Sequence, residues 1–479
     1  MKIVANNISI RQGDFMLRNI SFSLNDNDNL LITGASGSGK TTLAKALSGQ
    51  LFVAEGLKIE YSSDSDLPAK AVYVEQRYTI KNRSNTIDGY YQQRYNSADN
   101  EDSYTVSEEL KSVSDDETRI GFLLNELSVS YIKDKPLLQL SSGEHKKFQL
   151  IKALLKPAQL LILDDPFTGL DAAGRDKLSK ILNDISVAGT KLIIVSGAHH
   201  HVPDCITHVL ELEEKGGVRG EVPDCFASLA TTKYNLPVLP LQQNESNFEN
   251  AVLMKNVTVE YSDKIILDNI RWQVKKGERW LLKGRNGAGK STLLSLIFAD
   301  NPQAYANEIY LFDKRRGEGE SIWDIKKNIG FVSPELCAFF DRTVSCFDAV
   351  ASGYFDTMGI YRKPSERQIR YINDWLKALN VASLAQRRLS EVSSGTQRLF
   401  LLIRSLIKNP PLLILDEPCQ GLDEYQTESF IRLTDDICRQ TDKTIVYVSH
   451  YENEIPSCIS HELELEEGKI KLCRSRITS

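Results

Sequence analysis

The chain has 479 residues, of which 41% are hydrophobic and 25% are charged, and its net charge is -6. This composition is typical of a soluble globular protein and excludes a mainly disordered, collagen-like or membrane-embedded chain. No apolar run reaches the ~18 residues that a spanning helix needs, and no signal peptide is visible. We therefore expect a cytoplasmic protein that reaches a membrane only through a partner. The acidic balance argues against nucleic-acid binding.

A short apolar run at residues 29–33 predicts the first buried strand, and residues 42–47 have helical character. The loop between them is rich in glycine, whose backbone N–H groups can curl around phosphates at a helix N-terminus. We expect Lys40 to reach the β- and γ-phosphates of ATP and Thr41 to bind Mg²⁺. The nine candidate phosphate-binding residues are Gly34, Ala35, Ser36, Gly37, Ser38, Gly39, Lys40, Thr41 and Thr42.

Two further apolar runs, at residues 160–163 and 191–195, predict buried parallel strands. Asp164 ends the first of them, where a carboxylate can hold the Mg²⁺ shell. The next residue, Asp165, could take a proton from an attacking water molecule. Alternating strands and helices predict an α/β core with a mainly parallel sheet.

Residues 216–249 begin with glycines and continue with prolines and a polar run, a composition that predicts a linker. Before it, three consecutive histidines, His199 to His201, could suggest a metal site. Consecutive side chains diverge, however, so a loop or surface position is favoured. The eight cysteines form no Cys-x-x-Cys pair and are expected to be reduced thiols.

The motifs of the first half recur in the second half at an offset of about 250 residues. Ser291 corresponds to Thr41 and Asp416 to Asp164, as candidate Mg²⁺ ligands, and Glu417 corresponds to Asp165. The pattern predicts two tandem domains, 1–215 and 250–479, joined by the linker. The second set of candidate phosphate-binding residues is Gly284, Arg285, Asn286, Gly287, Ala288, Gly289, Lys290, Ser291 and Thr292.

Four further segments, two in each half, carry a family resemblance. Leu140-Ser141-Ser142-Gly143-Glu144 and Val392-Ser393-Ser394-Gly395-Thr396 resemble the signature of the ATP-binding cassette (ABC) ATPases, and Gly169-Leu170-Asp171 and Gly421-Leu422-Asp423 resemble their D-loop. The resemblance implies P-loop NTPase domains with helical subdomains, here at about 77–139 and 335–391. It also implies that the two halves pair head to tail around two ATP sites. Ser141 and Gly143 would then complete the second half's site, and Ser393 and Gly395 the first half's.

The two halves differ at the positions that the resemblance marks as catalytic. The second half has Glu417 and His450, which match the family's catalytic Glu and switch His, and Tyr261 is placed to stack on adenine. The first half has Asp165 and Gly197 instead, and its adenine position falls near Arg11-Gln12, with Phe15 as a substitute. A displacement of about 1 Å can cost on the order of 100-fold in rate. We therefore expect the second site to hydrolyse ATP faster than the first.

The family's metal-binding glutamine corresponds to Gln76 in the first half. In the second half Pro334 stands at this position, with Glu335 beside it. This departure puts Mg²⁺ coordination or partner sensing at that site in doubt.

Two functions remain open at this point. The second half resembles the molybdenum-transport-associated type of tandem ABC protein in three segments, Arg315-Arg316-Gly317, 322–327 and 352–356. This resemblance implies an energy-coupling subunit with a permease on another chain. The alternative is a soluble ATPase that acts on ribosomes, nucleic acid or a protein partner. The short inserts and linker favour the first. Residues 90–95, Tyr90-Tyr91-Gln92-Gln93-Arg94-Tyr95, are either a permease contact or a solvated surface loop.

Overall fold

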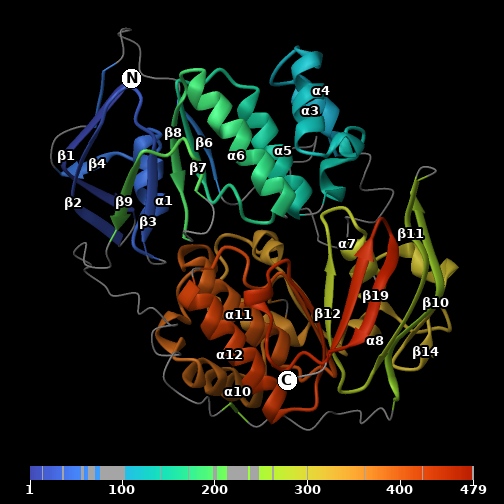
Figure 1. Cartoon of the computed structure of the whole chain (residues 1–479). Coiled ribbons are helices and arrows are strands. Elements are labelled where there is room, and N and C mark those ends of the chain that lie inside the picture. The colour runs from blue at the N-terminus through green and yellow to red at the C-terminus, as the bar shows by residue number, and fades with distance from the viewer. Residues whose placement is uncertain are drawn as a thin grey trace. The chain divides into compact units, whose positions relative to one another are not determined.

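The computed structural model describes most of the chain, and its described part forms two compact units. The first unit holds the elements from β1 to β9 and the second those from β10 to β19 (Figure 1). β9 ends at Leu212 and β10 begins at Asn250, on either side of the predicted linker. The described residues are 1–12, 15–34, 37–55, 59–62, 71–75, 103–140, 142–170, 172–197, 202–212, 236–237, 248–261, 264–298, 300–360, 362–422 and 424–476.

The first unit is built on a five-stranded parallel sheet. Its strand order is β6-β7-β8-β3-β9, and every residue of β7 and β8 is buried. Parallel sheets are covered on both faces, which explains why these strands are apolar except at Asp164 and Lys191, rather than alternating. The strands are β3 (Leu30–Gly34), β6 (Ala71–Val74), β7 (Leu160–Asp164), β8 (Lys191–Val195) and β9 (His208–Leu212).

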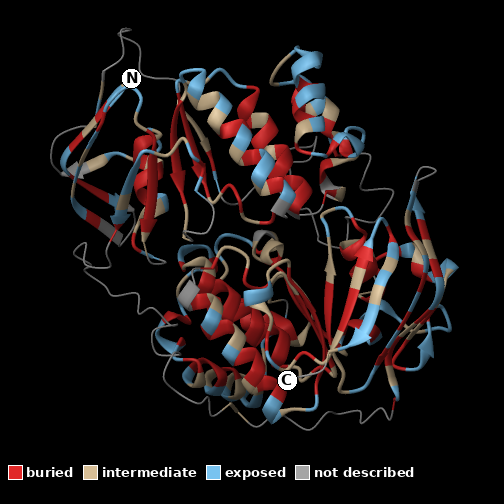
Figure 2. Ribbon diagram, viewed as in Figure 1, coloured by how far each residue is buried: buried red, intermediate tan, exposed pale blue. Residues whose placement is uncertain are grey.

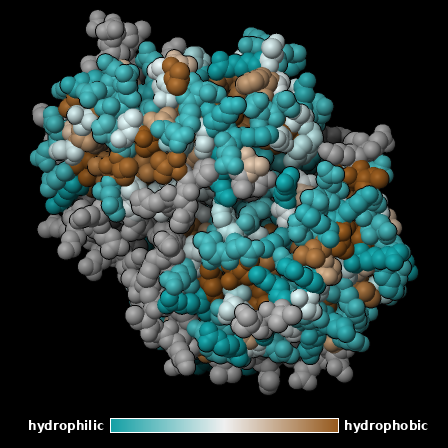
Figure 3. Space-filling model, in the orientation of Figure 1, coloured by the Kyte–Doolittle hydropathy of each residue, from teal (hydrophilic) through white to brown (hydrophobic). Residues whose placement is uncertain are grey.

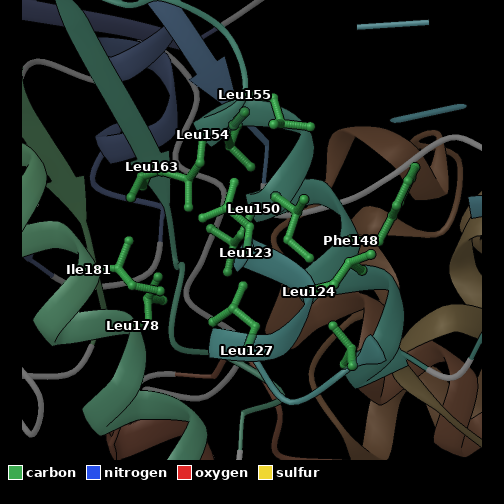
Figure 4. Close-up of a cluster of buried hydrophobic side chains, with 14 of the residues drawn as sticks. Leu123, Leu124, Leu127, Phe148, Leu150, Leu154, Leu155, Leu163, Leu178 and Ile181 are labelled. Carbon is green, nitrogen blue, oxygen red and sulfur yellow. The ribbon is translucent and has the colours of Figure 1, made fainter. Parts of the chain in front are cut away.

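Alternate residues of each central strand enter different hydrophobic clusters. Leu161 and Leu163 of β7 pack with the helices α4, α5 and α6, whereas Leu160 and Ile162 pack with α1 and the antiparallel strands. Figure 4 shows the first cluster, in which side chains from all three helices meet Leu163. The helices are α1 (Lys40–Leu47), α3 (Val106–Lys111), α4 (Glu117–Glu126), α5 (Ser142–Leu154) and α6 (Ala172–Val187), with 3-10 turns η2 (Ser130–Ile132) and η3 (Leu137–Gln139).

Polar caps fix the starts of the short helices in the first unit's insert. Thr105 and Glu108 form a reciprocal capping box at α3, and the Asp116 side chain accepts from the Arg119 N–H at α4. An antiparallel sheet of β1 (Lys2–Gln12), β2 (Phe15–Leu24), β4 (Val53–Glu55) and β5 (Glu60–Ser62) completes the unit.

The second unit repeats this architecture. Its six-stranded sheet has the order β15-β16-β17-β12-β18-β19, with only β19 antiparallel to its neighbour. A second sheet, β11-β10-β13-β14, is antiparallel. The strands are β10 (Asn250–Tyr261), β11 (Lys264–Lys275), β12 (Arg279–Gly284), β13 (Glu308–Leu311), β14 (Lys314–Arg315), β15 (Ile329–Val332), β16 (Leu412–Asp416), β17 (Thr444–Val448), β18 (His461–Glu466) and β19 (Lys469–Ser475).

The helix α11 is the centre of the second unit's helical part, because every residue from Gly395 to Leu406 is buried. In Figure 2 the strands of the central sheets are mostly buried, while outward helix faces are exposed. The helices are α7 (Lys290–Ile297), α8 (Ile322–Lys326), α9 (Cys346–Ala351), α10 (Glu366–Ala378), α11 (Ser394–Leu406) and α12 (Glu424–Gln440). The 3-10 turns are η4 (Pro302–Ala306), η5 (Pro334–Phe339), η6 (Ser352–Tyr354), η7 (Ala382–Leu384), η8 (Leu389–Glu391) and η9 (Glu452–Glu454).

Hydrophilic residues cover most of the face seen in Figure 3, with apolar residues in smaller areas. Among the described residues, no helix combines the length and the apolar composition needed to cross a membrane.

The contact between η6 and α11 leaves no room for a side chain at Gly353, since a Cβ there would lie 2.2 Å from the Arg404 carbonyl oxygen. We predict that Gly353→Ala destabilises the second unit by about 2 kcal/mol, within the range of overpacked cores. Gly121→Ala is the matched control, because nothing lies within 4 Å of that Cβ in α4. It should stabilise by about 0.5–1 kcal/mol. Urea unfolding followed by circular dichroism measures both, and equal effects would contradict the packing argument.

Candidate functional site

The first glycine loop connects β3 to α1. Gly34, Gly37 and Gly39 have φ values of 136°, 83° and 97°, which side-chain-bearing residues rarely adopt. A Cβ on Gly34 would also lie 2.2 Å from the Leu212 carbonyl oxygen. The Lys40 Nζ donates to the Gly34 carbonyl 2.6 Å away, so the lysine folds back over the loop. Ala35 and Ser36 lie outside the described residues.

The second glycine loop connects β12 to α7, and its three equivalent glycines have similar backbone conformations. Gly284, Gly287 and Gly289 have φ values of 150°, 82° and 99°. The Lys290 Nζ donates to the carbonyls of Gly284 at 2.8 Å and of Arg285 at 3.1 Å. Both loops therefore combine a glycine-shaped turn, a lysine over the loop and a helix N-terminus, which together favour a bound phosphate.

A hydroxyl and a carboxylate meet beside the first loop. Thr41 lies in the first turn of α1 and Asp164 ends β7, and the Thr41 hydroxyl donates to Asp164 Oδ2 over 2.8 Å. Oxygen ligands of this kind suit Mg²⁺, which is bound through one or two carboxylates plus substrate phosphates. Ser291 and Asp416 occupy the equivalent places in α7 and at the end of β16.

Tyr73 also reaches Asp164, and the sequence analysis did not single it out. Its hydroxyl donates to Asp164 Oδ2 over 3.0 Å, and burial followed by the Asp164 charge raises the pKa of Tyr73. Tyr73 pairs with Ile162 and Phe331 with Ile414, so Phe331 is the counterpart in the second unit and carries no hydroxyl. Strand alternation on β6 and β7 could have found this contact, once the register was known.

The residue after each strand-ending aspartate has an unusual backbone. Asp165 and Glu417 have φ values of 47° and 45°, and their N–H groups donate to the carbonyls of Val195 at 2.8 Å and Val448 at 3.0 Å. Non-glycine residues with positive φ are uncommon. Such backbone strain clusters at active sites and ligand clamps, and its recurrence in both units fits two equivalent sites.

The pKa values of Asp165 and Glu417 are shifted in opposite directions. Burial, followed by the charge of Asp164, raises the pKa of Asp165 to about 6, although the Gly197 N–H donates to its Oδ1 over 3.3 Å. Burial also raises the pKa of Asp164. Two adjacent buried carboxylates disfavour each other's ionisation, so the first site holds a proton more readily.

In the second unit a histidine faces the carboxylate. The His450 Nε2 lies 3.0 Å from Glu417 Oε1, and the Gln420 Nε2 donates to Oε2 over 3.1 Å. Burial opposes ionisation of Glu417, but His450 and then Lys290 outweigh it, and the pKa of Glu417 is lowered. Glu417 is therefore held ionised, as a proton acceptor must be. The sequence had not identified Gln420 as a partner.

Tyr261 ends β10 with a 37% exposed side chain, as a residue that stacks on a ligand ring requires. Asn301 Nδ2 donates to its hydroxyl over 2.9 Å and fixes its direction. Asn301 is a supporting residue that the sequence analysis missed. At the corresponding place in the first unit, Arg11 and Gln12 end β1 and Phe15 begins β2.

The second signature segment caps a helix. Ser393 is the N-cap of α11, and its Oγ accepts from the Thr396 N–H over 3.3 Å. Gln397 donates to the carbonyls of Leu389 and Val392 and so ties the helix to the preceding segment. Gly395 is buried in the first turn of α11, and Gly143 is buried in the first turn of α5.

Several sequence-predicted positions lie outside the described residues. They are Ser141, Asp171, Asp423, Gln76, the histidines 199–201 and the tyrosine-rich segment 90–95. Pro334 and Glu335 begin η5, and the Arg398 Nη1 donates to the carbonyl of Ser333 just before them, over 3.3 Å. No group of three or more His, Cys, Asp or Glu residues in the described ranges is arranged to hold a metal.

The chain is similar to known proteins in sequence. Residues 17–168 and 267–420 match the family model described as ABC transporter. The ABC transporter ATP-binding protein ModF of Escherichia coli is 34% identical over 95% of this chain and 96% of its own length. An uncharacterized ABC transporter ATP-binding protein of Schizosaccharomyces pombe is 30% identical over the same shares. The cbiO1 structure from Clostridium perfringens, 23% identical, covers 47% of this chain and 88% of its own, with a TM-score of 0.41. The chain belongs to the ABC transporter family, as an ATP-binding and ATP-hydrolysing protein with two cassettes.

Proposed function

We propose that the two cassettes hydrolyse ATP at unequal rates, the second quickly and the first slowly. The observation that carries this proposal is the contact between His450 and Glu417, 3.0 Å apart. At the equivalent place in the first unit, the Asp165 carboxylate accepts from the backbone N–H of Gly197 and lies near the Asp164 charge. The first unit thus has a shorter acid, and Gly197 stands at the position of His450.

At the second site, Glu417 accepts the proton of the attacking water and His450 keeps it ionised and oriented. Lys290 and the N–H groups of residues 284–291 bind the phosphates and stabilise the charge that develops on them. Ser291 and Asp416 would hold a Mg²⁺ ion, which would neutralise the phosphate charge when bound. Thr41 and Asp164 would hold the ion at the first site, with Gln76 as the proposed third ligand.

At the first site, two features slow the reaction. The Asp165 carboxyl is one methylene shorter than glutamate, and a misplacement of about 1 Å costs on the order of 100-fold. Its pKa of about 6 leaves part of the population protonated near neutral pH. In addition, the Tyr73 hydroxyl occupies a lone pair of Asp164 Oδ2. This site is suited to holding ATP.

We further propose that the halves pair head to tail. Ser141 and Gly143 would act on the ATP of the second half, and Ser393 and Gly395 on that of the first half. The capped, buried start of α11 supports this role, because Ser393 and Gly395 sit at a helix N-terminus suited to an anion.

The chain is proposed to be the energy-coupling subunit of a transporter, at the cytoplasmic face of the inner membrane. Its likeness to ModF over nearly the whole of both chains supports this role and suggests a molybdate-type oxyanion as cargo. The permease is proposed to be a separate chain.

The catalytic asymmetry gives the first test. Glu417→Gln should lower kcat for ATP by about 100-fold or more, because general base catalysis contributes that much. Asp165→Asn, the matched isosteric change at the other site, should lower it less than about threefold, since that site contributes little turnover. Steady-state phosphate release measures both. A Glu417→Gln chain that keeps more than half of the wild-type rate would refute the assignment.

The opposite pKa shifts give a second test. Because the pKa of Asp165 is raised from 3.8 to about 6, the folded first unit loses stability as pH rises through that window. Asp165→Asn should therefore stabilise it at pH 7.5, by up to about 3 kcal/mol, and have little effect near pH 4. The lowered pKa of Glu417 stabilises the fold above about pH 4.5, so Glu417→Gln should destabilise the second unit at pH 7.5. Urea unfolding at pH 4 and pH 7.5 measures the free energy of unfolding of both variants. If the two substitutions changed the stability at pH 7.5 in the same direction, the predicted opposite pKa shifts would be contradicted.

The transport role gives a third test. A tagged Glu417→Gln chain is expected to hold ATP, since it lacks the base. Purified from membrane and soluble fractions of its native cells, it should enrich one multi-spanning membrane protein. Wild-type chain without nucleotide is the control and should enrich less of it. Enrichment of ribosomal or nucleic-acid-bound proteins with no permease would overturn the transport role.

A further inference from the structure

Two cysteines outside the ATP site lie side by side in the second unit. Cys438 is in the last turn of α12, and Cys458 lies in the segment between η9 and β18. Their sulfur atoms are 2.7 Å apart, and each is present as a free thiol. This pairing could not be predicted from a motif, because the two residues are 20 positions apart and form no Cys-x-x-Cys pair.

A carboxylate on α12 fixes the backbone of Cys458 independently of the sulfur contact. Asp435 Oδ1 accepts from the Cys458 N–H over 2.8 Å, and Asp435 Oδ2 accepts from the Ser457 hydroxyl over 2.9 Å. Asp435 and Cys438 are three residues apart and therefore lie on one face of the helix. The Cys458 segment is thus seated on α12 where Cys438 projects. The usual obstacle to forming a disulfide is the backbone movement that it requires. Here a bond between the two sulfurs requires little movement.

We propose that Cys438 and Cys458 are an oxidation site for hydroperoxides, which join them in a reversible disulfide. Cys458 is the more exposed of the two, so its sulfur attacks the peroxide oxygen, giving a sulfenic acid and one water. The Cys438 sulfur then displaces the hydroxyl as a second water and forms the S–S bond. Two thiols lose two electrons and two protons, and one hydrogen peroxide becomes two waters. A small dithiol reverses the bond by exchange.

The reduced pair is stable under reducing conditions. The neighbouring Cys438 thiol, together with burial, raises the pKa of Cys458. The thiolate is the reactive form, so this site reacts more slowly than the low-pKa thiols of redox enzymes. The bond should therefore form under oxidative load and not during ordinary turnover.

The bond would close a loop that contains the catalytic histidine. β17, Ser449 and His450 all lie between residues 438 and 458. The part of the loop from Ser449 to Glu454 is already held, because Ser449 Oγ donates to Glu454 Oε2 over 2.7 Å. The disulfide fastens the end of the loop, at Cys458, to α12. Since the sulfurs already touch, the contact of His450 with Glu417 stays in place, while the unfolded chain loses freedom. Oxidation should protect the second unit against heat without changing its turnover.

The test uses the full-length chain, reduced or treated with hydrogen peroxide. After treatment, peptide mapping should find Cys438 joined to Cys458, with a mass about 2 Da below the reduced form. The melting temperature of the second unit should rise by several degrees and fall back with dithiothreitol. The ATPase rate at 25 °C should stay within about twofold of the reduced chain.

Matched variants separate this site from general oxidation. Cys438→Ser and Cys458→Ser should each abolish the link and the thermal shift, while Cys473→Ser, an exposed cysteine on β19, should keep both. The proposal fails if peroxide leaves residues 438 and 458 unlinked while Cys473 is oxidised. It also fails if either serine variant still shows the thermal shift. These outcomes do not depend on which cassette hydrolyses ATP.

Discussion

Each ATP site depends on the direction of its parallel strands. Because β3, β7 and β8 run the same way, their carboxyl ends meet at one edge of the sheet, and the residues that follow them become neighbours. The contact of Thr41 with Asp164, across 123 positions of sequence, results from this arrangement. The same register in the second unit brings together the ends of β12, β16 and β17, and with them Lys290, Glu417 and His450.

Because the two units share the same strand arrangement, the chemical differences between them can be compared position by position. Asp165 and Glu417 have nearly the same backbone, with φ values of 47° and 45°. Their pKa values move in opposite directions because one faces a second carboxylate and the other an imidazole. The two units therefore share this backbone conformation and differ in the charges around it, which is the basis of the proposed difference in reactivity.

Much of this could be predicted from the sequence, because the repeated motifs are local and their residues are close in sequence. The glycine loops, the strand-ending aspartates and the α/β core of both units were predicted in this way. Contacts that depend on strand register and side-chain direction could not be. Tyr73 reaches Asp164 only because β6 pairs with β7 in one particular register. Asn301 and the Cys438–Cys458 pair are likewise contacts between segments that no motif connects.

In the second unit, a buried polar network lies beside Glu417 and His450, and two of its positions are apolar in the described part of the first unit. The Tyr447 hydroxyl lies 3.4 Å from Cys419 Sγ and donates to the Glu454 carbonyl over 2.8 Å. Cys419 follows Glu417 by two residues and Glu454 holds Ser449, so the network joins the two segments that carry the acid and the histidine. By register and motif the counterparts of Tyr447 and Cys419 are Ile194 and Phe167, which pack in the hydrophobic core. Apolar packing stabilises a fold but does not orient a polar side chain. A satisfied buried network selects one geometry, as transfer of a proton between fixed groups requires.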